Sequence, residues 1–125
     1  MPVETKNAKV ALVTGGARRI GAEIARTLHQ AGMNIVLHYH ASETEAMALV
    51  AELNKIRAGS AVAVAGALTN AENTLQVASS ALEAFGRIDA LINNASKFYR
   101  TPFGDVTEAA WNDLIDSNIK APFFL

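Results

Sequence analysis

The sequence predicts an α/β fold built on a doubly wound parallel sheet. Strand-like apolar segments alternate four times with amphipathic helical segments, and the connections are short. This alternation is typical of parallel strands joined by right-handed crossovers. The first apolar segment, Val10 to Val13, is continuously apolar, as expected of a strand with helices on both faces. We expect one domain over residues 1–125, strand order 3-2-1-4, and a sheet that stops before a fifth strand.

A glycine-containing turn follows the first strand. Thr14 and Gly15 open it, and a helical pattern begins at Ile20 and Gly21. Gly15 allows a sharp turn and lets a phosphate approach the backbone, whereas Gly21 allows the helix to pack close to the strand. The free N–H groups at the start of that helix would face the phosphates. This order of strand, turn and helix predicts a dinucleotide site.

Each later element has a recognisable beginning and end. Strands are expected at 34–38, 61–67 and 90–93, where apolar residues lie between turn residues. Capping boxes are expected at Ser42–Glu45 and Thr69–Glu72, and Thr107 is expected to cap the last helix. The apolar residues predicted to face the sheet are Ile20, Ile24 and Leu28, then Ala46, Leu49, Val50 and Leu53, then Leu75, Ala78, Leu82 and Phe85, and finally Trp111, Leu114 and Ile115.

Composition limits the function classes. The chain has 125 residues, of which 50% are hydrophobic, so it can bury a core. A net charge of −1 provides no sequence-wide attraction to nucleic acid or to anionic membranes. The absence of cysteine excludes disulfides, thiolate metal sites and a cysteine nucleophile. The longest apolar run, 61–68, is too short to span a bilayer. We expect a soluble, cytoplasmic protein without a nucleic-acid or membrane partner.

The end of the second strand favours NADP over NAD. An NAD enzyme usually has Asp or Glu there, which binds the adenosine ribose and repels a 2′-phosphate. This chain has no acid between the strand and Glu43. Arg18 is placed to reach the same ribose, with His38 and Ser42 as further donors to a phosphate. His38 and His40 could alternatively bind a metal, but no third ligand is evident, so no metal is expected.

Three motifs together resemble the pteridine reductase branch of the short-chain dehydrogenase/reductase family. They are T-G-G-A-R-R-I-G, L-H-Y-H-A-S and I-N-N-A-S-K-F-Y, and the similarity extends from about Ala8 to Leu125. Arg19 stands where most of the family has its middle glycine. The resemblance implies a Rossmann-type sheet and an NADPH-dependent reduction of pterins, including dihydropteridine- or dihydrofolate-type substrates. It also implies a homo-oligomer, a tetramer by analogy.

The resemblance assigns functions to the matching residues. Arg19 would point into the cleft between the pyrophosphate and the pterin, Ser96 would bind the pterin, and Phe98 would stack on its ring. Asn118 would support a water-linked proton relay and is the catalytic candidate. The residues implied in cofactor binding are Gly15, Arg18, Arg19, Ile20, Gly21, His38, Tyr39, His40, Ser42, Leu68, Asn94 and Ala95.

Some positions depart from the family pattern. Ala41 replaces an arginine of the phosphate clamp, and Ala67 lies where the related reductases have an adenine-binding aspartate. The chain also contains no Tyr-x-x-x-Lys motif, so these 125 residues alone are expected to be inactive. Two other functions therefore stay open. One is a 3-oxoacyl or other carbonyl reductase of the same fold, and the other is a non-catalytic NADP-binding module.

Overall fold

A four-stranded parallel sheet forms the centre of the molecule. The computed structural model describes residues 7–97 and 99–125. The strands are β1 (Val10–Val13), β2 (Asn34–Tyr39), β3 (Ala61–Ala65) and β4 (Ala90–Ile92), in the order β3-β2-β1-β4. Every neighbouring pair is parallel. The predicted fold class and strand order are confirmed.

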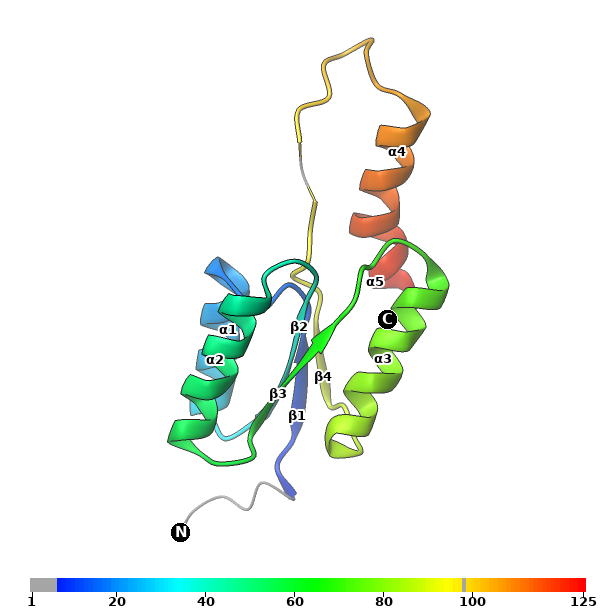
Figure 1. Cartoon of the computed structure of the whole chain (residues 1–125). Helices are drawn as coiled ribbons and strands as arrows, with labels where there is room; N and C mark the ends of the chain where they lie inside the picture. Colours follow the sequence, from blue (N-terminus) through cyan, green and yellow to red (C-terminus); the bar gives the residue numbers. More distant parts are fainter. Residues whose placement is uncertain (1–6, 98) are drawn as a thin grey trace.

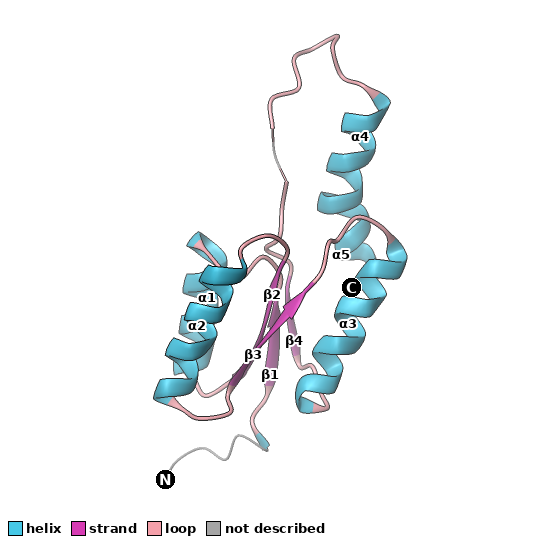
Figure 2. Cartoon of the chain, in the orientation of Figure 1, coloured by secondary structure: helices cyan, strands magenta, loops and turns pink. Residues whose placement is uncertain are grey.

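Helices cover both faces of this sheet (Figures 1 and 2). The first pair, α1 (Arg19–Gln30) and α2 (Glu43–Ile56), lies on one face, and α3 (Ala71–Phe85) lies on the other. The last helical region is continuous and consists of α4 (Glu108–Ile115), the π-helix η2 (Asp116–Lys120) and α5 (Ala121–Phe124). In Figure 1, α4 and the loop before it extend beyond the carboxyl ends of the strands. No helix in the described ranges has the length and apolar character needed to cross a membrane.

The core consists of two apolar clusters, one on each face of the sheet. All residues of β1 and β2 are buried, which explains the continuously apolar sequence of β1 and the apolar centre of β2. Alternate residues of these strands point to opposite faces: Ala11 and Val13 pack with α1 and α2, whereas Val10 and Leu12 pack with α3 and α5. β4 is only half-buried. The two central strands therefore fix the positions of all the loops at their carboxyl ends.

The predicted inward faces of α1 and α3 are wrong in part. Ile24, Leu28 and Phe85 pack against the core as predicted, but Ile20 is 70% exposed, Leu75 is 55% exposed and Leu82 is 49% exposed. The fully buried positions carry mostly small or β-branched side chains, which allow the helix axes to approach the sheet closely, together with His29. These buried residues are Gly21, Ala22, Ala25 and His29 in α1, and Thr74, Val77 and Ala81 in α3.

The prediction for α4 is also wrong in part, whereas that for α2 is confirmed. Trp111 is 59% exposed, and no residue of α4 is fully buried, since this helix projects past the sheet. In α2, the predicted residues Ala46, Leu49 and Leu53 are buried, and Val50 packs at the margin of the same cluster.

Helix caps and strand ends also differ from the sequence expectations. Ser42 precedes α2 but makes no capping hydrogen bond, and Asn70 rather than Thr69 caps α3 by accepting from the Asn73 amide at 2.8 Å. Thr107 caps α4 as predicted, accepting from the Ala110 amide at 3.1 Å. β2 is one residue longer than predicted. β3 and β4 are shorter, because the chain leaves the sheet toward the loops described below.

A buried polar network fastens α1 and α2 to the amino end of β3. The His29 ring Nε2 lies 2.7 Å from the Ser60 hydroxyl oxygen, and Arg57 donates to the carbonyls of His29 and Met33 at 3.2 and 2.6 Å. Burial lowers the pKa of His29, and the nearby Arg57 charge lowers it further. The neutral imidazole is therefore the form compatible with the folded chain.

We predict that the fold loses stability as the pH falls through the unfolded pKa of histidine, about 6.5, toward the lower pKa of His29 in the folded chain. The pKa of His29 in the folded chain lies below its unfolded value of about 6.5. The contribution of His29 to the free energy of unfolding is therefore complete above a pH of about 6.5 and is lost as the pH falls from there through the folded pKa. Urea unfolding at several pH values measures the effect, and His29→Gln is expected to reduce the pH dependence. Equal pH dependence in the variant and the parent chain would contradict the assignment.

Candidate functional site

The turn after β1 is joined to the end of β4 by Thr14 and Asn94. The buried Thr14 hydroxyl accepts from the amides of Asn94 and Ala95 at 3.1 and 3.0 Å and donates to the Ile92 carbonyl at 3.3 Å. The Asn94 side-chain amide donates in return to the carbonyls of Thr14 and Gly15 at 3.1 and 3.0 Å. Sequence analysis did not identify this function of Thr14. The available signal was a hydroxyl residue directly after a fully buried strand.

Two glycines make this close approach possible. Gly15 has a φ of +60°, and a Cβ there would lie 2.9 Å from Ala95 Cα. A Cβ on Gly21 would lie 2.5 Å from both the Gly15 carbonyl oxygen and the Asn94 amide nitrogen. A side chain at either position would therefore push the first turn of α1 away from β4. The sharp turn expected at Gly15 and the close helix packing expected at Gly21 are thus observed, whereas the approach of a phosphate to Gly15 stays a prediction.

Arg19 begins α1 in a strained backbone conformation. Among the described residues it is the one non-glycine residue with a positive φ, at 54°. An L-residue with a side chain pays a steric penalty of about 1–2 kcal/mol in this left-handed region. The conformation also explains why glycine is usual at this position in the family that the sequence resembles. Backbone strain of this kind is characteristic of functional sites.

A cavity of about 450 Å³ opens beside this turn at the carboxyl edge of the sheet. It is bounded by the glycine turn, the start of α1, the segment that follows β2 and the segment that follows β4. Twelve of the residues predicted from the sequence line it, and Ala17 and Ala41 complete the lining. The twelve are Gly15, Arg18, Arg19, Ile20, Gly21, His38, Tyr39, His40, Ser42, Asn94, Ala95 and Ser96.

Two predicted site residues do not line this cavity. The side chain of Leu68, a predicted cofactor residue, is buried in the apolar cluster with Val64 and Val77. Asn118, the catalytic candidate, lies in η2 and contacts Lys97 instead. Phe98 falls outside the described residues. The expected grouping around the glycine turn is thus observed for all the described cofactor residues except Leu68, and for the substrate-side residues Arg19 and Ser96.

The cavity lining is suited to an anion. Arg18 and Arg19 are exposed at its rim, and none of its lining residues, all within the described ranges, is Asp or Glu. Arg18 occupies the N-cap position of α1 without making a side-chain capping hydrogen bond, and the first turn of α1 contains no acidic residue. The first N–H groups of α1 have no partners within the helix and therefore add to the positive potential. Phosphate groups are the common biological ligand for such an arrangement.

The His38 side chain is not available as the predicted hydrogen-bond donor to a 2′-phosphate. Its Nδ1 accepts from the Gly15 amide at 3.0 Å, and its Nε2 lies 2.7 Å from the Gly66 carbonyl oxygen. Both ring nitrogens are occupied by the backbone, so neither is free to donate to a 2′-phosphate. Burial lowers the pKa of His38, and His40 lowers it further. The alternative of a metal held by His38 and His40 fails for the same reason, and no cluster of three potential metal ligands exists in the described chain.

Asn118 fixes the backbone that follows Ser96. Its side chain accepts from the Lys97 amide at 2.7 Å and donates to the Lys97 carbonyl at 2.8 Å. The neighbouring Asp113 accepts from the Lys97 ammonium at 2.8 Å and from the Tyr99 hydroxyl at 2.9 Å, and both contacts lower the pKa of its carboxyl group. Sequence analysis missed these partners because they depend on where the long loop lies.

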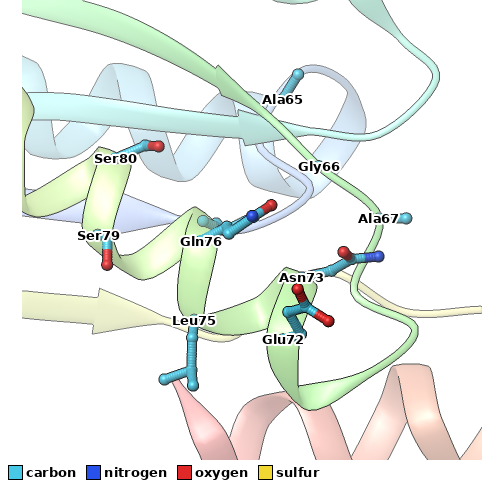
Figure 3. Close-up of a pocket in the computed structure, with 10 residues that line it drawn as sticks. Ala65, Gly66, Ala67, Glu72, Asn73, Leu75, Gln76, Ser79 and Ser80 are labelled. Carbon is cyan, nitrogen blue, oxygen red and sulfur yellow. The ribbon is translucent and has the colours of Figure 1, made fainter.

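A larger hollow of about 630 Å³ lies between the end of β3 and α3 (Figure 3). Polar side chains from α3, including Asn73 and Gln76, line it together with Ala65 to Ala67. Glu72 is the one charged residue in its lining, all of which is described. A negative charge disfavours a phosphate ligand there. The smaller cavity beside Arg18 is therefore the candidate nucleotide site.

Comparisons with known proteins agree with this architecture. A family model described as short chain dehydrogenase matches residues 9–125. Pteridine reductase 1 of Leishmania tarentolae is 40% identical to the chain, and the alignment covers 94% of the chain and 52% of the relative. A 3-oxoacyl-[acyl-carrier-protein] reductase of Synechocystis sp. is 39% identical over 93% of the chain and 47% of the relative.

A third relative, the short-chain dehydrogenase/reductase FrzI of Cladobotryum sp, is 32% identical over 94% of the chain and 45% of its own length. The chain thus spans about half the length of the curated relatives it matches.

We predict that Arg19→Gly raises the free energy of unfolding by about 1 kcal/mol, because glycine adopts the positive φ without the steric penalty of a side chain. Urea denaturation at fixed pH measures the change. Arg18→Gly is the matched control, since Arg18 has an extended backbone at φ −142° and gains nothing from glycine. Equal or lower stability in Arg19→Gly, relative to the parent chain, would contradict the strain assignment.

Proposed function

The chain belongs to the short-chain dehydrogenase family, and from that premise we propose that it forms the NADP(H)-binding part of a reductase that acts on pterins. The observation that carries the proposal is the positively charged cavity between the glycine turn and the end of β2, with Arg18 at its rim and no carboxylate in its lining. A carboxylate at the end of β2 would repel the 2′-phosphate of NADP. Arg18 instead offers a planar, permanently charged partner for it.

The hydrogen bonds of the turn indicate which groups would bind the phosphates. The amides of Gly15 and Gly16 already donate to the ring and the carbonyl of His38, both at 3.0 Å. The first N–H groups of α1, beginning at Arg19, have no intrahelical acceptor. We propose that the pyrophosphate binds these N–H groups and that the Arg19 guanidinium group balances its charge, whereas Arg18 binds the 2′-phosphate.

The chemistry of the reaction is divided between the cofactor and the protein. When bound, the nicotinamide supplies the hydride. In our proposal this chain binds and orients the dinucleotide, and Asn118 holds the backbone beside Ser96, where the substrate would lie. The sequence contains no Tyr-x-x-x-Lys motif to provide the general acid. We therefore expect the 125-residue chain to bind cofactor without reducing substrate.

A pterin is the substrate class that we favour. Arg19 in place of the usual glycine, the segment L-H-Y-H-A-S at the end of β2 and the similarity to pteridine reductase 1 support it. The alternative, a 3-oxoacyl reductase, has comparable support in the 39% identity to the Synechocystis protein. A non-catalytic NADP-binding module is the third possibility, supported by the missing tyrosine and lysine. Assembly into a homo-oligomer and a cytoplasmic location remain part of the proposal.

We predict that NADPH binds the chain at least about tenfold more tightly than NADH, since one charge-assisted contact contributes roughly 1.5–3 kcal/mol. Calorimetry at fixed salt measures both dissociation constants. Arg18→Glu is expected to abolish or reverse the preference. Lys55→Glu, an exposed charge change on α2 outside the cavity lining, is the control and should leave it intact. Equal dissociation constants for the two cofactors in the parent chain would rule out the NADP assignment.

The substrate assignment is tested with Phe98→Ala in the complete protein, whose residue 98 lies outside the described structure. We predict a higher KM for a dihydropterin with little change in NADPH affinity, because loss of the ring would remove stacking on the substrate. A 3-oxoacyl substrate assayed in parallel distinguishes the carbonyl-reductase alternative. Preferential turnover of that substrate, or a large loss of thermal stability in the variant, would contradict the prediction.

A further inference from the structure

His38 connects three segments that meet at the nucleotide cavity. It lies in β2 and is only 2% exposed. One ring nitrogen contacts Gly15 in the turn after β1, and the other contacts Gly66 immediately after β3. The Gly66 amide also donates to the Tyr39 carbonyl at 3.0 Å, so β3 is joined to β2 beside the histidine. The side chain therefore connects two loops through a single rigid ring.

The chemistry of the two partners assigns the protonation state of this ring. The Gly15 amide can only donate, so Nδ1 must be an unprotonated acceptor. The Gly66 carbonyl can only accept, so Nε2 must carry the proton. A doubly protonated imidazolium would set two N–H groups against each other at Nδ1. The arrangement thus requires a neutral histidine with its proton on Nε2.

The surrounding charges favour the same neutral state. His40 from the end of β2 and Arg18 and Arg19 from the turn line the same cavity as His38. These groups are cationic or can become so, and no carboxylate in the described lining offers compensation. Burial lowers the pKa of His38 and the charge of His40 lowers it further, whereas the hydrogen bond to the Gly66 carbonyl acts in the opposite direction. Burial and the cationic groups of the lining thus oppose a positive charge on this ring.

We propose that His38 is a positioning residue for the nucleotide, which fixes the Gly15 amide and so sets the direction in which the chain enters α1. The inference rests on the proposed function. With the Gly15 and Gly16 amides held by His38, the turn keeps the positive φ at Gly15 and presents the first N–H groups of α1 to the ligand. The ring acts on the pyrophosphate region that NADPH and NADH share, rather than on the 2′-phosphate that distinguishes them.

An effect on the shared pyrophosphate can be distinguished from an effect on the 2′-phosphate with His38→Phe, which keeps a planar ring but removes both nitrogens. We expect the dissociation constants of NADPH and NADH for the 125-residue chain to rise by the same factor, about tenfold, so that their ratio is unchanged. His38→Gln, whose amide can both donate and accept, is expected to restore part of the affinity for both cofactors. Arg18→Glu, in contrast, changes the ratio.

A second measurement does not depend on cofactor binding. Nitrogen-15 NMR of the parent chain is expected to show the Nε2–H tautomer of His38, retained at pH values where free histidine is protonated. The Gly15 amide resonance should move in His38→Phe. Lys55→Glu, an exposed change on α2 outside the cavity lining, is the control and should leave that resonance in place.

Several outcomes would overturn the positioning assignment. They are a loss of NADPH affinity alone in His38→Phe, unchanged affinity for both cofactors, or an Nδ1–H tautomer in the parent chain. If His38→Phe fails to fold, His38→Gln takes its place: the dissociation constants of NADPH and NADH must then change by the same factor in His38→Gln. If the parent chain binds neither dinucleotide, the proposed function itself fails, and the NMR result then shows whether the hydrogen bonds exist without that function.

Discussion

The close contact between the turn after β1 and the end of β4 is the constraint on which the site depends. The hydroxyl of Thr14 and the amide of Asn94 make reciprocal hydrogen bonds across it, and the missing Cβ atoms of Gly15 and Gly21 leave room for them. Because Gly21 lies in the first turn of α1, the same contact sets how closely that helix approaches the sheet. The cavity beside Arg18 is a consequence of this packing.

The rotation of α1 follows from the same contact. With Gly21 against the Gly15 carbonyl, the small residues Ala22 and Ala25 continue the line of closest approach, and Ile20 is turned outward. Arg19, between Ile20 and the N-cap, accepts a left-handed backbone conformation as a result. In our interpretation the site keeps this local strain because it places two guanidinium groups at the rim of a cavity without carboxylates.

The strand order was expected from the alternation of strand and helix patterns together with the order usual in such folds. Most residues around the cavity were expected from the glycine turn and from the family resemblance. Rotation of α1 and α3 was not predictable in this way, since Ile20 and Gly21 are adjacent and helical periodicity alone does not say which of them faces the sheet. The bonds of His38 were also missed. They join residues that are 23 and 28 positions apart, so they depend on the register in which the strands pair rather than on any local motif.

The central claim is that a dinucleotide binds in the cavity beside Arg18. Amide NMR spectra of the chain, recorded during titration with NADPH, test it most directly. Our account predicts that the saturable shifts fall on the first turn of α1, on the segment after β2 and on residues 94–96. Shifts confined to the hollow between β3 and α3, around Glu72 and Gln76, or no saturable shifts at all, would contradict it.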